Sequence, residues 1–240
     1  MTTYLQLCQD TALESGVIGG TGLPTSVLAQ NQADLRRVVL WVRDGWVEIQ
    51  NSDNGWRFLR KRFTAATIVA NTDQYTPATL GISDFARWLV DDDQRSDHYN
   101  DGLTIYKTSD GEGYEYPLRV VDWDDYSRVY LRGTQTANAP RVVAVAPDNS
   151  LWLGPKPDAA YTLRGPYERT PQVLAANADE PLCPARFHNI VKYKAMMKLA
   201  RFDEAALAYA GAEIEYRTML SDLRRDQLPT PRFEYGDPLA

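Results

Sequence analysis

The sequence holds few of the residues on which enzyme active sites and metal centres commonly depend. Its 240 residues include only two cysteines, Cys8 and Cys183, and two histidines, His98 and His188. Neither cysteine lies in a Cys-x-x-Cys or Cys/His spacing, which excludes the usual zinc sites and a disulfide framework. We therefore expect reduced thiols and a protein that folds inside the cell.

Long apolar runs and an N-terminal leader are also missing from the sequence. A membrane-spanning helix needs about 20 apolar residues in succession, and no run approaches that length. The first residues lack the charged start and apolar core of a signal peptide. We expect a soluble chain that is not exported.

Positive charge is in deficit, with 26 Lys and Arg against 32 Asp and Glu and a net charge of -6. A broad nucleic-acid-binding face is therefore not expected, because such faces rely on cations that neutralise phosphates. The strongest cationic cluster is Arg57, Arg60, Lys61 and Arg62, beside several aromatic residues. It could contact phosphate or a single strand, but a solvated edge or a subunit contact is the favoured interpretation.

Two patterns resemble ligand-binding motifs without completing them. Residues 19–22 (GGTG) suggest a phosphate loop, but the Lys-Ser/Thr pair of a Walker loop and the strand of a dinucleotide fingerprint are absent. A flexible loop is the better interpretation. The acidic runs at 91–93, with His98, and at 122–125 lack the alternating spacing of a calcium loop, so solvated acidic turns are expected.

A nucleophilic site is equally poorly supported. The sequence has no Gly-x-Ser-x-Gly elbow, and Cys183 is separated from His188 by Pro184 and a predicted helix start. A small buried cysteine is the ordinary alternative. We expect a protein that is not an enzyme and holds neither a cofactor nor a metal.

Helical periodicity marks both ends of the chain. Apolar residues recur at three- and four-residue steps over residues 3–15 and 31–49, and again from 185 onward. Asp203 is predicted to cap a further helix that reaches about residue 225. On that last helix Leu207, Ala210 and Ile214 form one apolar face, and Tyr209, Tyr216, Leu220 and Leu223 form another. Both faces are expected to be buried against neighbours.

The middle of the chain is predicted to be rich in strands. Short stretches of β-branched and aromatic residues alternate with turn formers. Hairpin turns are expected at residues 147–149 and at Asp110-Gly111. Short helices are expected at 82–89 and at 123–131, the second with Asp122 as its N-cap. The predicted strands are residues 63–70, 103–108, 119–122, 141–146, 151–153 and 161–164.

These patterns predict an α+β fold in which the helical bundle is discontinuous. Residues 1–50 and 181–226 would form the bundle, and residues 51–180 would be a β-rich insertion. Residues 227–240, with three prolines, would be an extended C-terminal arm. Phe233 and Tyr235 on this arm suggest docking on a partner, although such a tail is also often disordered in isolation.

The order of these elements and several short phrases resemble the head-to-tail adaptor (connector) proteins of tailed bacteriophages, in particular the podovirus type. The resemblance covers nearly the whole chain and rests on packing and turn residues without a catalytic signature. The phrases are residues 4–8 (YLQLC), 20–22 (GTG), 41–42 with 45–46 and 49–50 (WV, GW and IQ), 56–59 (WRFL), 73–77 (DQYTP), 151–158 (LWLGPKPD), 161–163 with Tyr167 (YTL and Y), and 179–184 with 187–188 and 190–191 (DEPLCP, FH and IV).

The resemblance implies a structural virion protein of the neck, assembled in the host cytoplasm as a twelve-fold ring. Its implied partners are the portal above, tail or nozzle proteins below, further copies of the chain, and double-stranded DNA that passes through the channel without sequence-specific binding. Candidate partner-binding residues are Phe233, Tyr235, Arg224 and Arg225. The alternatives are another neck or tail-terminator protein and a carboxylate-dependent hydrolase that uses the acidic runs.

Overall fold

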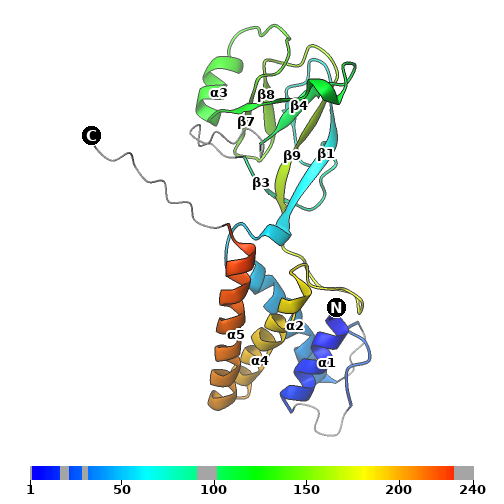
Figure 1. Cartoon of the computed structure of the whole chain (residues 1–240), viewed down its shortest axis with the longest axis vertical. Helices are drawn as coiled ribbons and strands as arrows, with labels where there is room; N and C mark the ends of the chain where they lie inside the picture. Colours follow the sequence, from blue (N-terminus) through cyan, green and yellow to red (C-terminus); the bar gives the residue numbers. More distant parts are fainter. Residues whose placement is uncertain (1, 17–21, 29–31, 91–101, 230–240) are drawn as a thin grey trace, which may run out of the picture. The chain divides into compact units, whose positions relative to one another are not determined.

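The computed structural model of the chain describes residues 2–16, 22–28, 32–90 and 102–229. The chain divides into two compact units, residues 1–59 with 171–240, and residues 60–170. The first unit is helical and the second is built mainly of strands (Figure 1). The predicted α+β class is therefore confirmed.

The helical unit buries one apolar core between its α-helices. Helix α4 contacts each of the other helices, and α2, α4 and α5 run side by side in Figure 1. Two short 3-10 turns, η1 (Arg57–Leu59) and η3 (Ala185–Phe187), complete the unit. The helices are α1 (Tyr4–Glu14), α2 (Ala33–Gln50), α4 (Asn189–Phe202) and α5 (Ala206–Gln227).

Helix α1 has a complete N-terminal cap, which confirms the helix predicted at residues 3–15. The Thr3 hydroxyl accepts a hydrogen bond from the Gln6 backbone N–H at 3.3 Å, and the Gln6 side chain accepts one from the Thr3 N–H at 3.0 Å. This reciprocal pair satisfies two donors that the first helical turn leaves free. The Tyr4 hydroxyl then donates to the Val39 carbonyl at 2.7 Å and joins α1 to α2.

Helix α2 follows the predicted apolar stripe. Every member of the stripe is buried, and Gly45 lets α4 approach closely, because a Cβ at that position would lie 3.2 Å from Lys194 Cγ. The stripe consists of Leu35, Val38, Val39, Val42, Trp46 and Ile49.

The turn between α4 and α5 differs from the expectation, because Asp203 ends α4 instead of capping α5. Glu204 adopts a left-handed conformation with φ of 54°, and the Ala205 N–H donates to the Ala200 carbonyl at 2.9 Å. This is the hydrogen bond of a Schellman ending, in which the chain reverses direction before it can offer an N-cap. Helix α5 begins only after this reversal.

The β-rich unit contains two sheets that enclose a common core. The first has the order β1-β9-β4-β5 with β3 also paired to β9, and the second has the order β2-β8-β7-β6. All pairs are antiparallel except β6 with β7. The strands are β1 (Arg60–Ile68), β2 (Gln74–Tyr75), β3 (Phe85–Trp88), β4 (Thr104–Lys107), β5 (Tyr116–Pro117), β6 (Arg119–Val120), β7 (Val142–Val145), β8 (Leu151–Gly154) and β9 (Tyr161–Arg169).

The helix predicted at residues 82–89 is wrong, because this segment forms β3. Its partner is the second half of β9, which continues beyond the predicted end at Arg164 through Gly165 and Pro166. Pro166 lacks an N–H but still accepts a hydrogen bond from the Leu89 N–H at 3.4 Å. Pairing with a distant strand thus overrides the local pattern.

Two local predictions in this unit are confirmed. Helix α3 (Trp123–Tyr130) begins after Asp122, whose carboxylate accepts a hydrogen bond from the Asp124 N–H at 2.9 Å. The hairpin between β7 and β8 turns at residues 147–149, where Asn149 has a φ of 63° and the Ala146 N–H donates to the Ser150 carbonyl at 2.9 Å. Asparagine tolerates this left-handed conformation better than most residues.

Candidate interaction surfaces

The C-terminal end of α5 is fastened to the rest of the helical unit by ion pairs. Arg224 Nε lies 2.9 Å from Asp53 Oδ2, and Arg186 pairs with Asp226. A hydrogen bond from Gln227 and the Arg186 guanidinium lower the pKa of Asp226. The C-terminal end of α5 is therefore held in place by ion pairs.

The structure separates the four predicted partner-binding residues. Arg224 is engaged within the unit, whereas the Arg225 side chain is 79% exposed and contacts only Asp222, at 3.3 Å, among the charged groups described. Phe233 and Tyr235 lie outside the described residues. Of the two arginines, Arg225 is the one available to a partner.

Helix α5 presents an apolar face without a cover among the described residues. Leu207 is 91% exposed and Ile214 is 66% exposed, and Ala210 and Gly211 between them are also exposed. We call these four residues the α5 outer face. The face was predicted to be buried, and the chain by itself does not bury it. The opposite face packs into the bundle through Tyr216, Leu220 and Leu223.

A pocket of about 230 Å³ lies between the start of α2 and the end of α4. The Trp41 and Phe202 rings are 5.7 Å apart, and the Arg37 guanidinium lies 4.4 Å from the centre of the Phe202 ring. Its lining residues come from helices far apart in sequence, so no local pattern could have identified it. They are Asp34, Arg37, Trp41, Leu199, Phe202 and Asp203.

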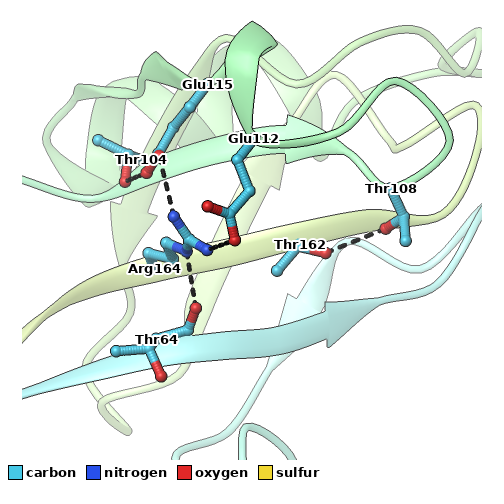
Figure 2. A network of polar contacts seen from close by, with 7 residues as sticks. All are labelled: Thr64, Thr104, Thr108, Glu112, Glu115, Thr162 and Arg164. Atoms are coloured by element: carbon cyan, nitrogen blue, oxygen red, sulfur yellow. Dashed lines mark hydrogen bonds and ion pairs between the residues drawn. The ribbon is translucent and has the colours of Figure 1, made fainter.

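A polar network around Arg164 cross-links strands of the first sheet of the β-rich unit (Figure 2). Arg164 Nε donates to the Thr64 carbonyl at 2.7 Å, at the β-bulge where β1 shifts register against β9. Its other nitrogens contact Glu112 and Glu115, and Thr104 donates to Glu115. Arg164 thus links β9 directly to β1, and to β4 through Glu115. Since all these groups are satisfied by one another, the network has a structural role.

The Cys183 and His188 side chains do not form a nucleophilic pair. His188 Nε2 lies 3.1 Å from the Cys183 backbone carbonyl, and its Nδ1 lies 3.2 Å from the Thr2 carbonyl. Burial raises the pKa of the Cys183 thiol to about 12, which keeps it protonated and unreactive at neutral pH. Burial likewise raises the pKa of Cys8.

The acidic runs do not form a metal site in the parts of the chain that are described. Within these ranges no group of three His, Cys, Asp or Glu side chains is placed to hold an ion. Asp122 caps α3, and Asp125 pairs with Arg128 at 3.3 Å. Residues 91–93 and His98 lie outside the described residues. None of the described helices is both long and apolar enough to cross a membrane.

The cationic cluster of the sequence is split between the two units. Arg57 belongs to η1, whereas Arg60, Lys61 and Arg62 are exposed on β1. Lys61 Nζ lies 3.2 Å from Asp84 Oδ2. Strand β1 is the edge of its sheet, so these three cations stand on a strand edge.

Comparison with known proteins assigns the chain to a family. The model of the SU10 adaptor protein family matches residues 2–235, which include all elements described above and both aromatic residues of the arm. No curated protein matches the chain. The family consists of phage adaptors, structural components of the virion neck. The match spans nearly the whole length, and the chain therefore belongs to the SU10 adaptor protein family of phage head-to-tail adaptors.

Proposed function

We propose that this adaptor assembles into a twelve-fold ring that joins the portal to the tail and surrounds the channel through which DNA leaves the capsid. The ring would form in the host cytoplasm and contact tail or nozzle proteins on its far side. The proposal is supported by the family assignment and, above all, by the α5 outer face. Its role is structural and requires no chemistry from the chain.

The α5 outer face has the properties of a helix-packing surface. Its two large apolar side chains are seven residues apart and therefore lie on the same side of the helix. Ala210 and Gly211 between them are small enough to let another helix approach closely. Burying Leu207 and Ile214 would stabilise a contact by about 1.5–3 kcal/mol for each side chain. In a ring, every copy would offer this face to its neighbour or to the portal.

The net charge of -6 suits a channel for DNA. Phosphates and an acidic wall repel one another, so the duplex would pass without being held. The arm, with Phe233 and Tyr235, and the exposed Arg225 would add contacts between proteins of the assembly.

Electron microscopy of purified chain incubated with portal rings tests this proposal. The native chain should add a ring of density beneath the portal. Replacing Leu207 and Ile214 with aspartate should abolish this density without changing the thermal stability, because both side chains are exposed. Val129→Asp is a matched control, since Val129 is 58% exposed in the other unit. It should assemble like the native chain.

Three outcomes would count against parts of the proposal. Native chain without ring density under the portal would refute the adaptor ring. Normal assembly of the Leu207 and Ile214 variant would show that the α5 outer face is not an interface. Unchanged portal binding after truncation behind Pro229, which leaves α5 whole, would exclude a portal contact through the arm.

A further inference from the structure

The first residues of β1 form a strand edge that is open on one side. Residues 60–63 pair with β9, from Arg60 opposite Glu168 to Phe63 opposite Gly165. On the other edge of this stretch, no backbone hydrogen bond joins it to any other described residue. An open sheet edge can pair with a further strand, and charged side chains on that edge disfavour pairing with apolar strands. The exposed cations of β1 leave this edge accessible to a strand that carries negative charge.

The two faces of this stretch make different demands on a partner strand. Arg60 and Arg62 are exposed and lie on one face, since side chains alternate along a strand. Phe63 lies on the other face, half-buried, with its ring 5.9 Å from that of Trp88 and 6.5 Å from that of Tyr167. A matching strand needs an acidic residue on one face and aromatic residues on the other.

The C-terminal arm carries this pattern. Residues 232–237 read Arg-Phe-Glu-Tyr-Gly-Asp between Pro231 and Pro238. In an extended strand, Phe233 and Tyr235 would share one face and Glu234 would lie on the opposite face. We propose that residues 232–236 of one copy add as an antiparallel strand to the open edge of β1 in an adjacent copy. This inference rests on the self-assembly proposed above.

One register satisfies charge and packing together. Glu234 lies directly opposite Arg62 and diagonal to Arg60, and Tyr235 covers the Lys61 ammonium, a favourable cation–π arrangement. The parallel orientation with the same Glu234–Arg62 pair would instead set Arg232 against Arg60, a repulsive pair. In the antiparallel register, the directly opposite pairs are Arg232–Thr64, Phe233–Phe63, Glu234–Arg62, Tyr235–Lys61 and Gly236–Arg60.

The reach of the arm limits the choice of partner. Helix α5 ends at Gln227, and four residues precede the proposed strand. Four extended residues span at most roughly 14 Å. The receiving β1 edge must therefore lie close to the end of α5, as in a directly adjacent copy of a closed ring.

Disulfide trapping between chains tests the proposed register. A Thr64→Cys chain and an Arg232→Cys chain of different mass are mixed and assembled on portal rings under mild oxidation. The native Cys8 and Cys183 are buried and will not compete. A disulfide needs Cα atoms about 4.4–6.8 Å apart, which directly opposite residues meet. The mixed dimer is the expected product.

Thr67→Cys is the matched control, because Thr67 is also an exposed threonine of β1. It lies three residues further along the strand, roughly 10 Å away, and should not link to Arg232→Cys. Equal linking at both positions, or rings without any link, would overturn the inference. A third chain carries both substitutions, Thr64→Cys and Arg232→Cys. If disulfides form only within single copies of this chain, and never between the two single variants, the inference is also overturned, because each arm then pairs with β1 of its own chain.

A charge exchange gives a second and independent measurement. Arg62→Glu and Glu234→Arg should each weaken ring formation, and the two together should restore it, because the pair is then reversed. Unweakened assembly of Arg62→Glu would contradict the register. If rings form equally well with either charge-reversed variant, only the strand addition is refuted. If the native chain fails to form rings, the proposed function itself is refuted.

Discussion

At the scale of single residues, Glu204 has an unfavourable backbone conformation. Its φ of 54° places it in the left-handed region, which disfavours any residue with a Cβ atom. Glycine is the usual residue at this position after a helix. We expect Glu204→Gly to raise the free energy of unfolding by about 0.5–1 kcal/mol, measured by urea denaturation. Glu215→Gly, in the exposed middle of α5, should lower it by about 1 kcal/mol, and a loss in both variants would contradict the explanation.

Gly165 is a position in β9 where packing excludes any side chain. A Cβ there would lie 2.2 Å from Leu103 Cδ2 in the core of the β-rich unit. We expect Gly165→Ala to lower the free energy of unfolding by about 1–3 kcal/mol, because the core must shift to accommodate the methyl group. The matched Gly113→Ala adds a methyl group to open space and should change it by less than about 0.5 kcal/mol. Similar losses in the two variants would exclude a packing effect.

At the scale of elements, the sequence predicts best those structures that depend on their own residues. The helix at residues 3–15, the apolar stripe of α2 and the turn at residues 147–149 all rest on short-range patterns, and all three predictions are confirmed. Strand β3 and the second half of β9 depend instead on each other across some 80 residues. Local composition carries little information about such a pair, which is why a helix was predicted in place of β3.

The candidate surfaces show the same difference between features set by local sequence and features set by contacts between distant residues. The periodicity of Leu207, Ala210 and Ile214 revealed an apolar face on α5, but it could not show that the chain leaves the face uncovered. The pocket that contains Trp41 and Phe202, and the open edge of β1, arise only from tertiary packing. Conversely, Arg224 looked available in the sequence, but it is held by Asp53.

Asp179 connects one loop to the start of α1 and makes this connection sensitive to acid. Its carboxylate accepts the N–H groups of Ala175 at 2.7 Å and Ala176 at 2.8 Å, which lower its pKa. Its carbonyl accepts the Tyr4 N–H at 2.7 Å. A lowered folded-state pKa contributes stability above the unfolded value of about 3.9, and this contribution is lost as the pH falls through the folded value.

We therefore expect Asp179→Asn to be less stable than the native chain by about 1 kcal/mol at pH 7. The difference should shrink as the pH falls below about 4, because the unfolded carboxylate then binds a proton, and it should vanish once the pH falls through the lower pKa of the folded state. Urea denaturation at several pH values measures both effects. Asp10→Asn is the control, since the Asp10 carboxylate makes no hydrogen bond or ion pair with the described residues. A difference that stays constant with pH would show that the charge of Asp179 is not involved.

At the scale of the whole molecule, the chain combines two kinds of core. The helical unit takes its core residues from both ends of the sequence, and the β-rich unit takes its core from one continuous segment. Each core is enclosed by its own elements, so each unit can be stable in its own right. For an adaptor, this would allow one unit to bind neighbours while the other keeps its structure.

If the two units are separate domains, calorimetry of the full chain should show two thermal transitions. Gly165→Ala should then lower only the transition of the β-rich unit, and Asp179→Asn only that of the helical unit. A loss of 1 kcal/mol lowers the midpoint by roughly 4 °C in a domain of this size, which calorimetry resolves. A single transition that both variants lower would contradict independence, since it would mean that the two cores unfold as one cooperative unit.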